Sequence, residues 1–236
     1  MSITFKKKLL WVEKGHRKNI RMIVAFDTYY YDGYSYTVGG VFESWADTKV
    51  KYFVTSKRET IDAEYKPGEL YKRELPCIMQ CLKMLDLDDV DTIIVDGFVW
   101  LSENGKDRTP GIGMRLANAL LTEYNRPDIS IVGIAKNPYH CNIPDCVEIL
   151  RGESKTPLWI TCSEYYFTKN YASLIKQMVG NYRIPDIIKS VDAKTRDISS
   201  VGDKKQPKHK TYHIMTHDEW VELGKPQYCG MYVEDK

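Results

Sequence analysis

The chain has 236 residues, 43% of them hydrophobic, and its 34 Lys and Arg against 32 Asp and Glu give a formal net charge of +2. This composition is too hydrophobic and too weakly charged for a disordered chain. The near-neutral balance also excludes a protein that coats nucleic acid through bulk charge, so nucleic-acid binding would need local patches. No apolar run approaches the roughly 18 residues of a membrane helix, and we expect no membrane partner.

Cysteines and the N-terminus both bear on the compartment. The six cysteines form no Cys-x-x-Cys pair, which favours reduced thiols over a zinc site or a disulfide. The apolar stretch Leu9–Val12, within a basic N-terminus, is too short for a signal-peptide core. We therefore expect a cytoplasmic protein.

The first half of the chain begins with three segments of strand character. Residues 22–31 are rich in β-branched and aromatic side chains and end at the turn Asp32–Gly33, after which 34–42 and 49–55 follow. An Asp-Gly turn between such runs predicts an antiparallel meander. Residues 70–85 then carry apolar side chains at helical spacing.

Two buried strands follow, separated by a helix. Residues 92–96 and 130–136 are continuous apolar runs that end in Asp96 and Lys136, as buried parallel strands do. The helix between them is predicted over 114–124. A hairpin over 147–150 and 157–161, a helix over 168–179 with Thr168 as N-cap and a helix over 185–193 complete the series.

A meander followed by alternating helices and strands predicts an α/β fold. We expect a mixed sheet, with an antiparallel meander and parallel strands, and helices on both faces. The chain divides into a basic N-terminal extension (1–21), one domain (22–200) and a C-terminal appendage (201–236).

Three acids lie at informative places in this pattern. Asp27 lies within the first strand, Glu74 early in the first long helix, and Asp96 closes a buried strand. A carboxylate at such a position is expensive to bury unless it is paired or binds a cation. Carboxylate oxygens suit Mg²⁺, with Mn²⁺ as a substitute, and such a site can hydrolyse a phosphodiester. Each acid alone is more often structural, so the hypothesis depends on the three together.

Lys136 ends its strand as Asp96 ends its own. If the two strands are neighbours, the ammonium group reaches the same edge of the sheet. There it can hold a phosphate or pair with a carboxylate, and the sequence leaves both roles open.

The residues, taken in order, resemble the endonuclease V family of nucleases, which nick DNA or RNA near deaminated bases such as inosine. The resemblance spans about residues 22–197, and each piece is weak alone. It consists of Asp27 within Ala-Phe-Asp-Thr-Tyr-Tyr, Tyr65–Gly68, Lys72–Pro76, Ile94–Gly97, Gly133–Lys136, Pro157–Ile160 and Gly180–Pro185.

This resemblance implies an RNase H-like fold and assigns roles to individual residues. Asp27, Glu74 and Asp96 become catalytic Mg²⁺ ligands, Lys136 is a further catalytic residue that does not bind the metal, and Glu164 is the candidate for the fourth metal ligand. The resemblance also implies a set of nucleic-acid contacts. These are Tyr65, Lys66 and Pro67 as a wedge that replaces a lost stacking partner, with Gly68, Arg73 and Gly97 beside it.

A further histidine of the family is absent from residues 102–115, and the sequence departs from the family at two other places. The family's Asp-Gly-His-Gly is Asp96–Gly97–Phe98–Val99 here, and its late Ser-x-Gly-His falls near Thr161–Tyr165, where no histidine occurs. Both changes affect base recognition and the fourth ligand and spare the three acids. We therefore expect phosphodiester chemistry with altered or lost specificity for hypoxanthine.

Three interpretations follow from the sequence. The first is a Mg²⁺-dependent endonuclease that acts as a monomer, with DNA favoured over RNA as its partner. The second is a catalytically silent nucleic-acid-binding relative, which the missing histidine and glycine favour. The third is a domain whose acids are structural. The three retained acids and Lys136 favour the nuclease, because clustered carboxylates repel one another without a cation.

Overall fold

The computed structural model of the chain describes residues 21–59, 69, 71–102, 106–139, 143 and 145–199. The predicted N-terminal extension and C-terminal appendage lie outside these residues, and so does the predicted wedge of Tyr65, Lys66, Pro67 and Gly68.

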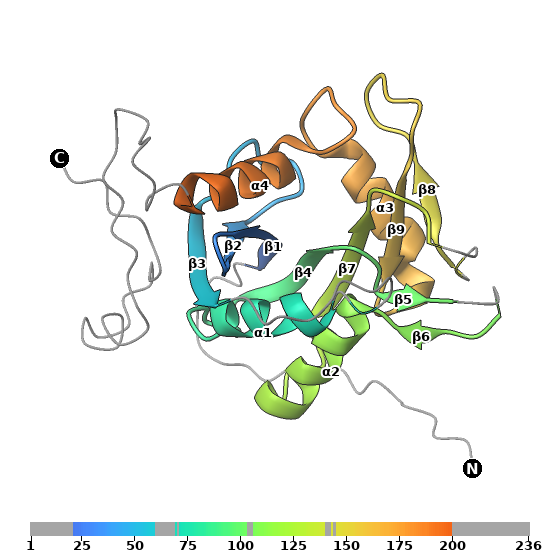
Figure 1. Ribbon diagram of the computed structural model, residues 1–236. Helices are drawn as coiled ribbons and strands as arrows, with labels where there is room; N and C mark the ends of the chain where they lie inside the picture. Colours follow the sequence, from blue (N-terminus) through green and yellow to red (C-terminus); the bar gives the residue numbers. More distant parts are fainter. Residues whose placement is uncertain are drawn as a thin grey trace, which may run out of the picture.

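A mixed sheet of seven strands forms the centre of the molecule, in the order β3-β2-β1-β4-β7-β9-β8 (Figure 1). Its strands are β1 (Met22–Tyr31), β2 (Tyr34–Phe42), β3 (Tyr52–Glu59), β4 (Val90–Asp96), β7 (Ser130–Ala135), β8 (Val147–Ile149) and β9 (Leu158–Cys162). A separate two-stranded ribbon joins β5 (Trp100–Leu101) to β6 (Thr109–Pro110).

The pairing directions agree with the sequence pattern. β1, β2 and β3 form the predicted antiparallel meander, while β1, β4 and β7 run parallel to one another. β9 returns antiparallel to β7 and pairs with β8 as the predicted hairpin. The carboxyl ends of β1, β4 and β7 therefore meet at one edge of the sheet.

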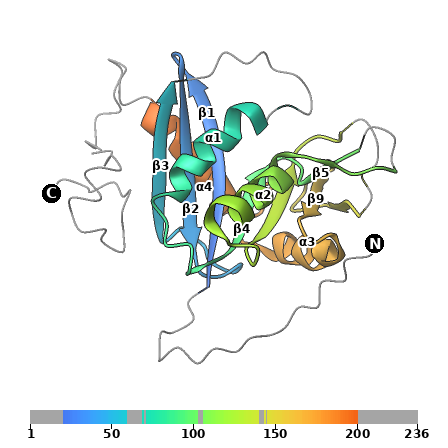
Figure 2. The same ribbon diagram turned by 90° about the horizontal axis from the view of Figure 1, so that it is seen from below.

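Helices cover both faces of the sheet, as Figure 2 shows from below. The helices are α1 (Tyr71–Leu82), α2 (Ile112–Tyr124), α3 (Thr168–Gln177) and α4 (Asp186–Ser199), with a short 3₁₀ helix η1 (Tyr165–Phe167) before α3. Because successive side chains of a strand point to opposite faces of the sheet, there are two hydrophobic cores, one on each face. Val24 and Phe26 pack with α1 and α2, whereas Ile23 and Ala25 pack with α3 and α4.

Two departures from the predicted helix ends have a physical reason in the structure. α4 continues to Ser199 rather than ending at residue 193, because Val191, Thr195 and Ile198 keep its buried stripe facing the sheet. Thr168 is not an N-cap: it lies inside the helix, and its Oγ1 donates back to the carbonyl oxygen of Tyr165 at 2.7 Å. No helix among the described residues is long and apolar enough to cross a membrane.

Candidate active site

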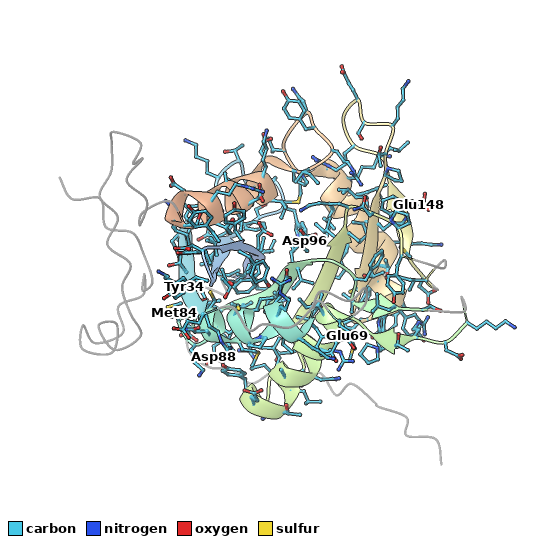
Figure 3. The ribbon with its side chains drawn as sticks, viewed as in Figure 1. Tyr34, Glu69, Met84, Asp88, Asp96 and Glu148 are labelled. Atoms are coloured by element: carbon cyan, nitrogen blue, oxygen red, sulfur yellow. The ribbon has the colours of Figure 1, made fainter. Side chains whose placement is uncertain are left out.

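The register of the parallel strands brings Asp27 beside Asp96. Phe26 of β1 is aligned with Val95 of β4, so the next residue along each strand is an aspartate. Asp96 is in turn aligned with Ile134 of β7, two residues before Lys136. Figure 3 shows Asp96 in the middle of the molecule, at the end of β4.

Strand alternation places these side chains on the same face. Ala25, Ile94 and Ile134 all belong to the core under α3 and α4. Asp27, Asp96 and Lys136 each follow one of them by two residues, and side chains two apart in a strand share a face. The two acids and the lysine therefore face α4 from three neighbouring strands.

A fourth side chain, which the sequence analysis missed, comes from α4. Asp192 accepts a side-chain hydrogen bond from Asp27, and it interacts electrostatically with Lys136. It also accepts from Arg196 Nη2 at 2.9 Å, one helical turn onward. Burial opposes ionisation of Asp192, but the bonds from Arg196 prevail and lower its pKa.

On the face of the sheet that α4 covers, Asp27 is the acid with a raised pKa. Burial, followed by the negative charge of Asp96, raises the pKa of Asp27 to about 7. Lys136 acts in the opposite direction without cancelling these effects. Near neutral pH, Asp27 is therefore protonated in a substantial part of the molecules, and its proton is then donated to Asp192.

Glu74 approaches the same point from α1, on the other side of the strand ends. Burial, then the charges of Asp96 and Asp27, raises the pKa of Glu74 to about 8. These interactions show that the three sequence-predicted acids share one electrostatic environment. Each negative charge makes the next harder to form, which is the condition that a bound cation relieves.

Lys136 forms an ion pair with Asp96, its Nζ lying 2.6 Å from Asp96 Oδ2. Of the two roles that the sequence left open for this lysine, the ion pair is therefore the one formed here. Burial lowers the pKa of Lys136, but Asp96 more than compensates, so the ammonium stays charged. The side chain keeps an exposed fraction of 42%, so it still reaches solvent beside the acids.

A cleft of about 1070 Å³ opens over this group. Its floor comes from the ends of β1, β4 and β7, and α4 and the segment before it form a wall. Acidic and basic side chains both line it: Asp27, Asp96, Glu153 and Asp192 together with Lys136, Arg183, Lys189 and Arg196. A phosphate chain and a cation can both find partners in a cleft of this kind.

Glu164 does not join the site, contrary to the prediction. It accepts from Ser130 Oγ at 3.2 Å, at the start of β7, whereas Lys136 follows the end of that strand. Six residues of strand separate the two ends, or about 20 Å at 3.3 Å per residue. The reason is direction: β9 runs antiparallel to β7, so the residues after β9 return to the opposite edge.

Two predicted nucleic-acid contacts lie among the described residues. The guanidinium of Arg73 lies 4.1 Å from the centroid of the Tyr30 ring, which places it beside β1 and near Glu74. Gly97 follows Asp96 with φ +121°, a left-handed conformation that favours glycine, and its amide donates to Ile134 at 3.1 Å. Gly97 therefore fixes the direction of the chain immediately after Asp96.

The residues that replace the family's His-Gly are part of the packed interior. Val99 is fully buried, and the amides of Gly113 and Met114 at the start of α2 bond the carbonyls of Phe98 and Val99. Phe98 makes an edge contact with Tyr139, with ring centroids 6.3 Å apart. The main-chain carbonyls of these two residues thus hold the start of α2, and their apolar side chains are buried in the interior.

The donor set suits a hard divalent cation by its chemistry. Asp27, Glu74, Asp96 and Asp192 offer only carboxylate oxygens, and burial followed by the charge of Asp96 raises the pKa of both Asp27 and Glu74. Within the part of the chain that the structure describes, however, no three His, Cys, Asp or Glu side chains converge closely enough to hold one ion. The internal partners explain this, since Asp96 is paired with Lys136 and Asp27 with Asp192.

Comparison with solved structures decides the fold. The endonuclease V of Bacillus subtilis matches with a TM-score of 0.53, at 18% identity over 80% of this chain and 84% of that one. The endonuclease V of Streptomyces avermitilis matches with a TM-score of 0.55, at 18% identity over 76% of this chain and 81% of that one. The chain has the endonuclease V fold.

The predicted fold class and the resemblance to endonuclease V are thereby confirmed at the level of architecture. A scan against protein-family models finds no match, and a search of curated proteins finds none. With identities of 18%, the endonuclease V fold alone is shared, and activity must be argued from the site.

Proposed function

We propose that the chain is a divalent-cation-dependent endonuclease that hydrolyses phosphodiester bonds in nucleic acid. The observation that carries this proposal is the meeting of Asp27, Asp96 and Asp192 with Lys136 in one cleft at the carboxyl ends of β1, β4 and β7. Ligands of open α/β sheets bind at such ends.

In this proposal Asp27, Glu74, Asp96 and Asp192 would hold Mg²⁺, or Mn²⁺ in its place, and Glu164 would not. A bound ion supplies charge neutralisation and polarises a phosphoryl oxygen. Lys136 would exchange part of its pairing with Asp96 for a phosphate oxygen, which a point charge on a flexible stem can do. Two basic residues that line the cleft, Lys189 and Arg196, would hold the nucleic-acid backbone.

Base recognition would differ from that of endonuclease V. Phe98, Tyr139 and Trp159 line a second cavity of about 340 Å³ next to the loop after Asp96. Bulky apolar groups there favour a changed base preference over the hypoxanthine specificity of the family. We propose DNA ahead of RNA as the substrate, and a monomer acting in the cytoplasm.

The second candidate is a silent nucleic-acid-binding relative. The internal pairing of the acids favours it, because Asp96 with Lys136 and Asp27 with Asp192 satisfy one another without an ion. In the nuclease, by contrast, a cation must compete successfully with Lys136 for Asp96.

A nicking assay separates the two candidates. The full chain is incubated with Mg²⁺ or Mn²⁺ and with DNA and RNA strands that contain inosine, uracil or an abasic site, next to unmodified strands. We expect metal-dependent nicking that Asp27→Asn and Asp96→Asn abolish, while Glu164→Gln nicks as wild type does. Binding without cleavage on every strand and with both ions would contradict the nuclease and leave the silent relative.

A further inference from the structure

Tyr182 is an exposed aromatic side chain at the active-site cleft. It lies in the loop 178–185 between α3 and α4, it lines the cleft together with Asp27, Asp96 and Asp192, and its exposed fraction is 66%. No other large hydrophobic residue in the described ranges is more exposed. An aromatic ring left in water beside a binding cleft usually meets a ligand there.

The loop that presents this ring is held by a buried arginine. Arg151, with an exposed fraction of 4%, lies just after β8 and donates to the carbonyl of Tyr182 at 2.9 Å and to that of Arg183 at 3.3 Å. It also donates to the carbonyls of Lys176, Met178 and Gly180. All five acceptors belong to the end of α3 and the loop, so one guanidinium fixes the path of the backbone beneath Tyr182.

A second contact locks the same loop from the side of β8. The carbonyl oxygen of Asn181 would lie 1.9 Å from a Cβ added to Gly152, which has φ +54°. The two loops therefore interlock, and Figure 1 shows them side by side above the sheet. The backbone that carries Tyr182 is thus held in place on both sides, and preorganisation of this kind lowers the entropy lost on binding.

A cation accompanies the ring. Lys189 Nζ lies 4.9 Å from the centroid of Tyr182, and both side chains line the cleft. An aromatic face next to a lysine is the combination with which proteins hold single strands, because the ring stacks on a base and the ammonium pairs with a phosphate.

We infer that Tyr182 is a stacking platform for one nucleobase of the strand whose phosphodiester lies over Asp27 and Asp96, with Lys189 pairing with an adjacent phosphate. The inference rests on the proposed nucleic-acid function. It adds the path of the bound nucleic acid, which leaves the cleft over the loop 178–185 rather than over β3. Since every base has an aromatic face, the platform is indifferent to sequence.

The test measures binding of fluorescein-labelled single-stranded oligonucleotides by anisotropy, with the full chain and Ca²⁺ in the buffer. Stacking on an aromatic is worth about 1–3 kcal/mol per base, so Tyr182→Ala should weaken binding about 5- to 150-fold. Tyr182→Trp and Tyr182→Phe should retain the wild-type affinity because both keep the ring. Lys189→Gln should lower the slope of log K against log salt by about one phosphate contact.

The matched control is Tyr166→Ala. Tyr166 has an exposed fraction of 60% but belongs to η1, beyond the end of β9 at the opposite edge of the sheet. It should bind as wild type does, and equal losses for the two alanine variants would overturn the inference.

An abasic site moved along the oligonucleotide gives a second measurement. At one position it should reduce the affinity of the wild-type protein to that of Tyr182→Ala and leave the variant unchanged, because the same stacking contact is removed twice. The absence of any such position, or unchanged binding by Tyr182→Ala, would overturn the inference while leaving the nuclease proposal intact. Wild-type protein that binds no strand at all would contradict both.

Discussion

At the scale of single residues, the fourth acid of the site is the sharpest point of difference between sequence and structure. Asp192 shares a hydrogen bond with Asp27 inside the cleft, whereas Glu164 bonds Ser130 at the other end of β7. The placement of the elements that carry the two acids separates their roles.

The two acids can be told apart by matched amide substitutions. Loss of a residue that orients or holds a metal costs about 10- to 100-fold in metal affinity or activity. We expect this loss in Asp192→Asn and wild-type behaviour in Glu164→Gln, in both the nicking rate and the Mg²⁺ dependence. Equal losses in the two variants, or a loss in Glu164→Gln alone, would contradict the placement of Glu164 outside the site.

At the scale of elements, the interlocked loops after β8 and after α3 shape one wall of the cleft. Gly152 has φ +54° and no room for a Cβ against Asn181, whereas Gly33 in the β1–β2 turn has φ +74° and nothing within 4 Å. The two glycines therefore share the conformational requirement and differ only in packing, which makes them a matched pair.

Alanine substitution at both positions measures the interlock. A left-handed conformation costs an L-residue about 1–2 kcal/mol, and overpacking adds about 1–3 kcal/mol. Gly33→Ala should lower the free energy of unfolding by the first amount only, and Gly152→Ala by about 1–3 kcal/mol more. Urea denaturation of the three proteins provides the comparison, and equal losses would show that the loop yields without cost.

The elements also show where sequence reasoning succeeds and where it stops. Buried runs that end in Asp96 and Lys136 predict parallel strands and a shared edge, because a continuous hydrophobic run is a local pattern that is typical of buried parallel strands. The return direction of β9 is a property of topology, and the misplacement of Glu164 follows from it. No local signal marks Asp192, because its place in the cleft depends on how α4 packs against β1 and β2.

At the scale of the whole molecule, the carboxylates of the site repel one another, and a bound cation would offset this repulsion. The negative charge of Asp96 on β4 helps to raise the pKa values of Asp27 on β1 and of Glu74 on α1. An ion held among these acids would link α1, on one face of the sheet, to the carboxyl ends of β1 and β4. Binding to the native state alone would then stabilise the entire domain against unfolding.

Thermal unfolding with Mg²⁺ or Mn²⁺ measures this linkage directly. At one hundred times the Kd, a ligand stabilises the native state by about 2.7 kcal/mol, which is about 5–10 °C in Tm for a domain of this size. We expect this rise in the wild type and its loss in Asp96→Asn, which removes a ligand and frees Lys136 at once. The same measurement with Ca²⁺ tests the selectivity of the site, because Ca²⁺ accepts more ligands and looser geometry than Mg²⁺. An equal rise in Tm would indicate a general oxygen site, and a smaller rise would indicate a site that selects smaller ions. A wild-type Tm that no divalent ion raises would contradict the metal site, because it would mean that no divalent ion displaces Lys136 from Asp96. The proposed nuclease would be contradicted with it.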